Sequence, residues 1–229
     1  MKTLLALMLF AIAEGAIADE NLDSVRSEVQ KALPNTPIDD VSTSPSNGLF
    51  TITSGKNVFY YDPIAKVIFF GEFYSITGTP ITETHTTDAL NNLINKYEKD
   101  AVVINIGSNI SHTIYEFVSP NCGYCQKYEE FISKYHNVKR VVFFVTGGVA
   151  SGNERLNQVL CSPAPVQDLS LLYTKSPSIK SVCEEGKRKL KAHGELVGKL
   201  GVVGTPTLYI DGTRIDGFKE QQIVSILNQ

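Results

Sequence analysis

The spacing of apolar positions in the first third of the chain changes once, near Pro34. Before Pro34, apolar residues recur every three or four positions, at Leu22, Val25, Val29 and Leu33. This spacing predicts one amphipathic helix that the proline ends. After it, short runs rich in β-branched and aromatic residues alternate with turn-forming residues, over 49–53, 58–61, 66–70 and 73–76. The pattern predicts an α+β unit, a helix plus an antiparallel meander, that ends near Thr82.

A second helical pattern follows this unit, within 84–100. Its apolar stripe consists of Leu90, Leu93, Ile94 and Tyr97. Thr86 is a candidate N-cap for this helix. We therefore expect a linker helix whose stripe packs on a domain or serves as a partner surface.

The remaining sequence predicts an α/β domain. The predicted strands are 101–106, 113–118, 140–145, 203–210 and 213–218. The predicted helices are 126–135, a helical insert over about 150–200, and 220–227. The strand, helix, strand order around 126–135 is typical of a parallel crossover. Asp211-Gly212 is a strong signal for a two-residue hairpin between the last two strands.

The N-terminus has the pattern of an export signal. Lys2 precedes the apolar run 4–12, and small residues ending at Ala18 form a candidate cleavage site. We expect residues 1–18 to be a signal peptide and the mature protein to lie in an oxidising compartment. A membrane anchor is the alternative, but the run is too short to span a bilayer and Glu14 follows it closely.

Charge and composition exclude some partners. The formal net charge is −3 at pH 7 and the composition is that of an ordinary globular protein. Without a strong basic field, the chain gives no reason to expect a nucleic acid or an anionic lipid as a partner. The candidate chemistry must come from particular residues.

The most informative motif is Cys122-Gly123-Tyr124-Cys125, between a predicted strand and a predicted helix. A cysteine at a helix N-terminus meets unpaired N–H groups and the positive end of the helix dipole, which stabilise a thiolate. Cys122 is therefore the candidate nucleophile for thiol-disulfide exchange. Cys125, one turn further along, is placed to attack the resulting mixed disulfide. Gly123 and Tyr124 would tune this couple through N–H donation and access to the sulfurs.

Half of a zinc site is the alternative interpretation of the motif. A structural zinc site needs a second close cysteine pair or histidines, but Cys161 and Cys183 lie far apart and no histidine adjoins them. The four histidines are scattered along the chain. We expect no metal and no cofactor.

At this point the chain resembles the periplasmic disulfide isomerases of the DsbC/DsbG family, within the thioredoxin superfamily. The resemblance spans nearly the whole length. The features that carry it are Cys122-Gly123-Tyr124-Cys125, Gly204-Thr205-Pro206, the wide pair Cys161 and Cys183, and the segment 73–80.

The resemblance implies an architecture and a set of partners. It implies a cystatin-like dimerisation domain over 19–83, a linker helix over 84–100, and a thioredoxin-like catalytic domain over 101–229 with the helical insert. It further implies a bacterial periplasmic homodimer, with misfolded or wrongly disulfide-bonded exported proteins as clients. A membrane thiol reductase of the DsbD type would keep it reduced.

The resemblance also implies roles for residues outside the motif. Pro206 corresponds to the cis-proline that faces the active-site disulfide, and the bend would free backbone groups of Thr205 to pair with an extended substrate. Cys161 and Cys183 would form a structural disulfide in the insert, stabilising the fold by about 3 kcal/mol. A second redox couple is the alternative, although neither cysteine has a helix-start context as clear as that of Cys122.

Glu116 departs from the closest family pattern, in which an uncharged residue is expected. Thioredoxins and DsbA-like oxidases carry a buried acid here, which could relay a proton to or from Cys125. A solvent-facing strand residue is the other interpretation.

The expected function is therefore a protein-disulfide isomerase that reshuffles or reduces incorrect disulfides, with chaperone activity toward unfolded chains. A DsbA-like oxidase or a dedicated reductase is the alternative, which Glu116 keeps open. A chaperone with a vestigial motif is the non-enzymatic alternative.

Overall fold

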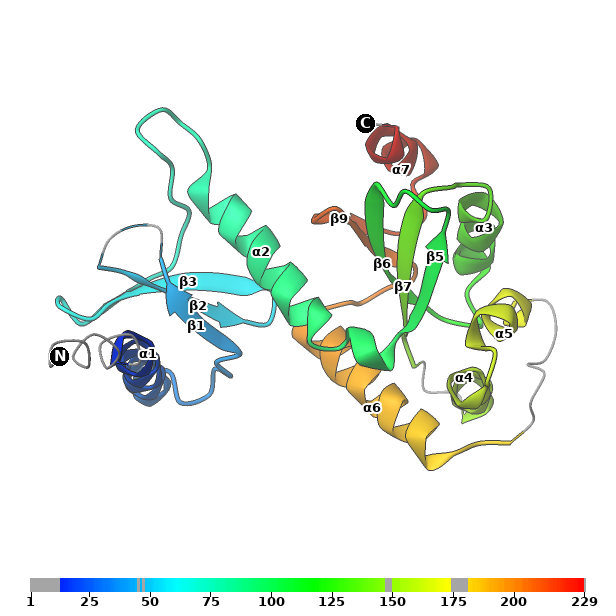
Figure 1. Cartoon of the computed structure of the whole chain (residues 1–229), viewed down its shortest axis with the longest axis horizontal. Helices are drawn as coiled ribbons and strands as arrows, with labels where there is room; N and C mark the ends of the chain where they lie inside the picture. The colour runs from blue at the N-terminus through cyan, green and yellow to red at the C-terminus, as the bar shows by residue number, and fades with distance from the viewer. Residues whose placement is uncertain (1–12, 45, 47, 147–149, 174–180, 229) are drawn as a thin grey trace, which may run out of the picture. The chain divides into compact units, whose positions relative to one another are not determined.

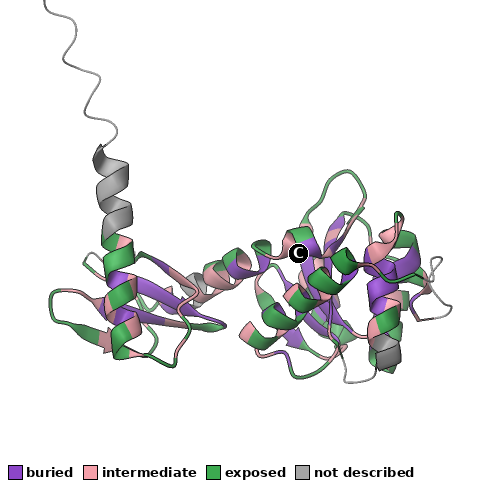
Figure 2. Ribbon diagram, turned by 90° about the horizontal axis from the view of Figure 1, so that it is seen from below, coloured by how far each residue is buried: buried purple, intermediate pink, exposed green. Residues whose placement is uncertain are grey.

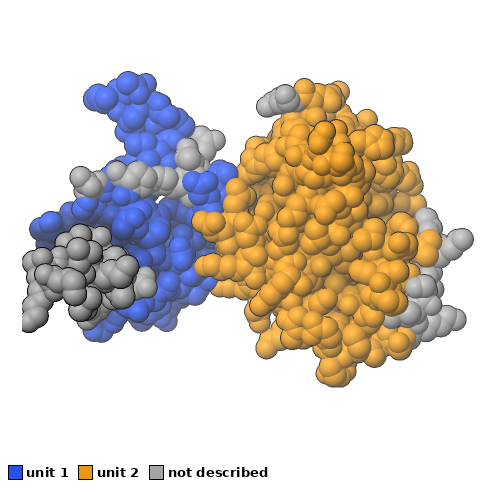
Figure 3. All heavy atoms as spheres, viewed as in Figure 1, with its two compact units in different colours: residues 1–89 blue, residues 90–229 orange. Residues whose placement is uncertain are grey.

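The computed structural model describes residues 13–228 except 45, 47, 147–149 and 174–180. The apolar run 4–12 of the predicted signal peptide lies outside these residues. The chain divides into two compact units, residues 1–89 and 90–229 (Figure 3). In the described part of the chain, no helix is long and apolar enough to cross a membrane.

The first unit is a helix packed on a four-stranded antiparallel sheet (Figure 1). Its elements, with the strands adjacent in chain order, are α1 (Ala13–Ala32), β1 (Asp40–Thr43), β2 (Phe50–Ser54), β3 (Asn57–Asp62) and β4 (Val67–Phe69). Val25 and Val29 of α1 are buried in one cluster with Ile52 and Phe59, which are partners in the register of β2 and β3. The predicted combination of a helix and a meander is confirmed.

Two details of this unit differ from the sequence prediction. Residues 73–76 form no strand, because the chain turns back at Gly78, which has a φ of 85°, and only an isolated bridge joins Tyr74 to Pro80. Ile76 is fully exposed, so this run has no core to face. The pattern also does not predict β1, since Val41 is its one buried residue.

α2 (Ile81–Asn95) begins earlier than expected, and Thr86 lies inside it rather than at its N-cap. The side chain of the buried Thr82 accepts hydrogen bonds from the Tyr60 hydroxyl at 3.3 Å and the Phe73 N–H at 2.7 Å. These bonds connect the first turn of α2 to β3 and to Phe73. The helix ends at Asn95, and a short 3-10 helix, η1 (Glu98–Asp100), follows. The predicted single helix over 84–100 is thus two helices.

The second unit contains a five-stranded mixed sheet in the order β5-β7-β6-β8-β9. The strands are β5 (Val102–Ile106), β6 (His112–Val118), β7 (Val138–Phe144), β8 (Thr207–Ile210) and β9 (Thr213–Asp216). The helices are α3 (Gly123–Ile132), α4 (Ala150–Cys161), α5 (Pro165–Leu171), α6 (Glu184–Lys199) and α7 (Glu220–Leu227).

The pairing of these strands confirms the predicted crossover. β6 and β7 are parallel and joined through α3, whereas β5, β8 and β9 pair antiparallel with their neighbours. Asp211 and Gly212 form the predicted hairpin turn, with φ values of 47° and 87°. β8 begins only at Thr207, since Pro206 before it has no N–H to donate to a ladder.

Alternate residues of β6 face two helical layers. Ile114 is buried with Tyr128 of α3 and Ile223 of α7. Tyr115 and Phe117 point to the other face, where residues of α2 and α6 cover them. Figure 2 shows that much of the strand backbone is coloured as buried. The catalytic candidates lie at the carboxyl end of β6, where α3 begins.

Candidate active site

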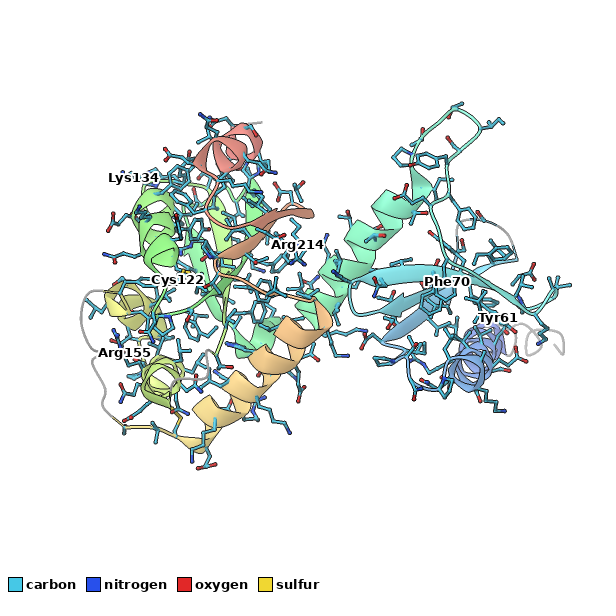
Figure 4. All side chains as sticks on the ribbon, turned by 180° about the vertical axis from the view of Figure 1, so that it is seen from behind. Tyr61, Phe70, Cys122, Lys134, Arg155 and Arg214 are labelled. Carbon is cyan, nitrogen blue, oxygen red and sulfur yellow. A yellow bond between two sulfur atoms is a disulfide. The ribbon has the colours of Figure 1, made fainter. Side chains whose placement is uncertain are left out.

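Cys122 is the N-cap of α3, as the sequence predicts. Its backbone is extended, and its Sγ accepts a hydrogen bond from the N–H of Cys125 at 3.1 Å. Cys122 is partly exposed and Cys125 is fully buried, and both are free cysteines (Figure 4). An accessible sulfur at the helix start, followed by a shielded one, suits attack by Cys122 and resolution by Cys125.

The residues between the cysteines have different surroundings. Gly123 is the first residue of α3. Tyr124 is exposed, and Nζ of Lys127 lies 5.5 Å from the centre of its ring. Tyr124 therefore presents an exposed aromatic ring in the first turn of α3.

The loop before β8 approaches Cys122 from the other side. The Thr205–Pro206 peptide bond is cis, and the Cys122 thiol donates to the Thr205 carbonyl at 3.2 Å. Val203, two residues before Thr205, is 97% exposed. Thr205 thus lies next to the sulfur of Cys122, and Val203 is exposed on the same loop.

Burial and the hydrogen bond with Cys122 raise the pKa of the Cys125 thiol to about 12, whereas hydrogen bonds with Ser119 and Thr205 act in the opposite direction. Cys125 lies among apolar side chains that include Val118 and Val142. At neutral pH this thiol needs a base when it attacks a disulfide.

Glu116 is completely buried, so its interpretation as a solvent-facing residue is wrong. Arg140 of β7 donates to it from Nε at 2.6 Å and from the second guanidinium nitrogen at 2.9 Å. The Tyr128 hydroxyl donates to Oε1 at 2.9 Å. Arg140 also binds Glu129 of α3, so two carboxylates share one guanidinium. Burial raises the pKa of Glu116, Arg140 lowers it, and the charge of Glu129 raises it again, with a net upward direction.

The sequence predicts Glu116 as a candidate but gives no prediction for the three side chains around it. Arg140 offered a signal, because it is a lone charge in an otherwise apolar predicted strand, and a charge there needs a partner. Tyr128 and Glu129 gave none beyond their place on the helix that carries the motif. Val203 was also missed, since an exposed valine has no local sequence signature.

Cys161 and Cys183 form a disulfide with an S–S distance of 2.02 Å. Cys183 is the N-cap of α6, and its Sγ accepts from the Gly186 N–H at 3.2 Å. The sequence argument that Cys183 has a less clear helix-start context than Cys122 is therefore wrong. The Asn157 side chain makes two hydrogen bonds to the backbone of Cys183. It accepts one from the Cys183 N–H at 3.0 Å and donates one to the Cys183 carbonyl at 3.2 Å.

Across the residues that the structure describes, no three His, Cys, Asp or Glu side chains come together as a metal site would need. Nδ1 of His112 is hydrogen-bonded to Oδ2 of Asp211 at 2.6 Å. His193 is buried beside the sheet.

Comparison with known proteins matches both halves of the chain. Residues 15–83 match the family model of the disulfide bond isomerase protein N-terminal domain, and residues 99–229 match that of a thioredoxin-like domain. The thiol:disulfide interchange protein DsbC of Pasteurella multocida is 26% identical over 196 residues, which cover 83% of this chain and 84% of that protein.

Two solved structures are similar in fold to part of this chain. A linker-deletion variant of ScsC from Proteus mirabilis has a TM-score of 0.53 at 19% identity, covering 64% of this chain and 82% of its own. A periplasmic thioredoxin-like protein from Salmonella enterica serovar Typhimurium has a TM-score of 0.52 at 18% identity, covering 60% and 95%.

Proposed function

This chain belongs to the thioredoxin-like family of thiol-disulfide oxidoreductases and carries the N-terminal domain of the disulfide bond isomerases, and on this premise we propose that it is a periplasmic protein-disulfide isomerase. The observation that carries the proposal is the position of Cys122. Its partly exposed sulfur caps α3 and contacts the Thr205 carbonyl at 3.2 Å, beside a loop suited to an extended client.

The reaction begins when the Cys122 thiolate attacks one sulfur of an incorrect client disulfide. A mixed disulfide forms, and the other client sulfur leaves as a thiolate with the bonding electron pair. If a second client thiol attacks the mixed disulfide, the client is isomerised and Cys122 is regenerated. If Cys125 attacks instead, the client is reduced by two electrons and Cys122–Cys125 becomes the disulfide.

Glu116 serves as the proton acceptor in the second branch. The Cys125 thiol must lose a proton as its sulfur bonds to Cys122, and its raised pKa makes direct loss to water slow at neutral pH. A buried carboxylate with a raised pKa is suited to take that proton and to return it when the disulfide is reduced. Reduction would come from a membrane thiol reductase of the DsbD type.

Clients bind along the loop before β8. The backbone of Thr205 pairs with an extended client segment, while Val203 and Tyr124 cover its apolar side chains. Such a surface also favours binding of unfolded chains, which supports chaperone activity. The predicted signal peptide over 1–18 supports export to the periplasm.

Homodimerisation through β4 completes the proposed function. β4 is an edge strand, because it lies at the end of the order β1-β2-β3-β4, and an edge strand offers backbone groups to a second copy. Large apolar side chains are exposed on it and beside it, at Val67, Phe69, Phe70 and Ile64. We expect Val67→Lys to yield a monomer in light scattering, while Val182→Lys, at an exposed valine of the second unit, remains dimeric. A dimeric Val67→Lys protein would contradict the use of this edge.

The proposed activity is tested on a scrambled multi-disulfide enzyme with a low concentration of redox buffer. The reduced protein should restore native enzyme activity, Cys122→Ala should abolish this recovery, and Cys125→Ala should retain part of it. Reduction of the client without recovery would favour the dedicated reductase, an alternative that the buried Glu116 supports. Full function of Cys122→Ala would leave only the chaperone.

A further inference from the structure

The active-site cysteines and the buried acid lie on facing surfaces of α3 and β6. Side chains of alternate strand residues share one face, so Ile114, Glu116 and Val118 point in the same direction. Val118 is buried with Cys125, and Ile114 is buried with Tyr128, which lies one turn along α3. Glu116 therefore lies along β6 between the residue buried with Cys125 and the residue buried with Tyr128.

Arg140 joins Glu116 of β6 to a second acid, Glu129 of α3. It contacts Glu116 through two nitrogens, at 2.6 Å and 2.9 Å, and Glu129 through two contacts, at 3.1 Å and 2.5 Å. The exposed fractions are 0% for Glu116, 3% for Arg140 and 19% for Glu129. With both acids ionised, a nearly dry cluster holds two negative charges and one positive charge.

We propose that Glu129 is a positioning residue that keeps Glu116 able to exchange a proton with Cys125 near neutral pH. This inference rests on the proposed function. Without Glu129, Arg140 and Glu116 would form a closed neutral pair, and such a pair holds its carboxylate ionised and makes it a weak base. Glu129 occupies the other part of the guanidinium and adds a negative charge, which favours protonation of Glu116.

The groups around Glu116 come from three elements. They are Arg140 from β7, Tyr128 and Glu129 from α3, and Tyr173, which lies just after α5. Tyr128 donates a hydrogen bond that favours the ionised acid, as Arg140 does. The charge of Glu129 acts in the opposite direction and raises the pKa of Glu116.

The proton transfer is balanced within the resolution step. The Cys125 sulfur forms a bond to the Cys122 sulfur, and the client thiolate leaves with the electron pair of the broken bond. The proton of the Cys125 thiol moves to the Glu116 carboxylate. No further oxidant is required, because the client disulfide supplies the oxidising equivalent.

The test follows single-turnover oxidation of the reduced full-length protein by a peptide disulfide that carries two labelled thiols. The second thiol is released only when Cys125 attacks, and its rate is recorded from about pH 5 to 9. We expect the wild-type rate to rise to a plateau. Glu129→Gln should move the midpoint to lower pH by at least about half a unit, because one pKa-raising charge is lost. Glu129→Asp, which keeps the charge, should restore the midpoint toward that of wild type.

Glu130→Gln is the matched control, since Glu130 is the adjacent carboxylate of α3 and is exposed. It should leave the midpoint unchanged. In a Glu116→Gln background, Glu129→Gln should cause no further shift, whereas a further shift would refute action through Glu116.

The proton relay through Glu116 and the role of Glu129 are refuted by different results. If Glu116→Gln leaves the wild-type profile unchanged, the proton relay of the proposed function is wrong. If Glu116→Gln removes the plateau but Glu129→Gln behaves like wild type, the relay stands and the role of Glu129 is refuted. A loss of rate at every pH with an unmoved midpoint would mark Glu129 as merely structural and would also refute the proposal.

Discussion

Acidification should destabilise the second unit through a single histidine, His193. The side chain is fully buried; its Nδ1 accepts the N–H of Phe144 at 3.0 Å and its Nε2 donates to the Asp100 carbonyl at 2.9 Å. The ring also meets Phe143 edge-on, with centroids 5.2 Å apart. Since Nδ1 must accept, a second ring proton would break the hydrogen bond to β7 and place a charge in the core.

The size of the effect follows from the two protonation equilibria. Burial lowers the pKa of His193 from 6.5 to about 4, a change that corresponds to roughly 3 kcal/mol of folding stability. Because the folded pKa is the lower one, this contribution is complete above the unfolded pKa and is lost as the pH falls through the folded value. At about pH 5, close to 2 kcal/mol of it should already be gone relative to about pH 8.

Denaturant unfolding at these two pH values, followed by far-ultraviolet circular dichroism, measures the loss. His193→Gln is the informative variant, because its amide can still accept and donate but does not titrate between the two pH values. We expect this variant to be less stable at pH 8 yet to lose about 2 kcal/mol less than wild type on acidification. If both proteins lose the same stability, other groups carry the acid sensitivity and the argument from His193 fails.

Four further variants test the helical insert and the client surface. Replacing Cys161 and Cys183 by alanine should lower the free energy of unfolding by about 3 kcal/mol, from the entropy of a loop with a sequence separation of 22, without abolishing thiol turnover. Gly186→Ala should lower the free energy of unfolding by about 1–3 kcal/mol, because the new Cβ would lie 2.6 Å from the Cys161 Sγ. Gly194→Ala, in the same helix, places a Cβ that meets nothing within 4 Å and should be neutral or stabilising. Val203→Ser should slow turnover of a protein client about fivefold, for about 1 kcal/mol of lost apolar contact, and leave a small disulfide reagent unaffected.

For each of these predictions, one outcome would contradict its physical reason. An unchanged unfolding transition in the double alanine variant would show that the disulfide adds no stability. Equal effects of Gly186→Ala and Gly194→Ala would show that the close approach to the sulfur is not the cause. Equal slowing of both substrates by Val203→Ser would place the defect in the chemistry rather than in client binding.

The elements that the sequence predicts well are those with strong local signals. α7 has the predicted bounds, and the hairpin at Asp211-Gly212 forms because both residues accept positive φ. The segment 73–76 shows the limit of such signals. Its composition favours a strand, but a strand needs a pairing partner, and the turn at Gly78 brings only Pro80 opposite Tyr74.

The candidate site also has one part that local sequence predicts and one part that it does not. Cys122 and Cys125 are only three positions apart along the chain, so their spacing predicts their geometry. The Glu116 environment is set by parallel pairing of β6 with β7, which places Arg140 opposite Ile114. No local pattern contains that register, so Glu116 is predicted as a candidate while its ion pair is not.

The sulfur of Cys122 is both the attacking atom and the N-cap of α3. This double role links the stability of α3 to the reduction potential of the Cys122–Cys125 couple, two quantities that are usually measured separately. It accepts the N–H of Cys125, the same residue to which it bonds on oxidation. A thiolate accepts a hydrogen bond better than a disulfide sulfur does, so α3 should be more stable in the reduced protein. By the thermodynamic cycle that connects folding with oxidation, this difference is part of the reduction potential. Each 1.4 kcal/mol that strengthens the first turn in the reduced state alone makes the couple about 30 mV more oxidising. A substitution in the first turn of α3 that never touches a client can therefore change whether the protein accepts or donates electrons.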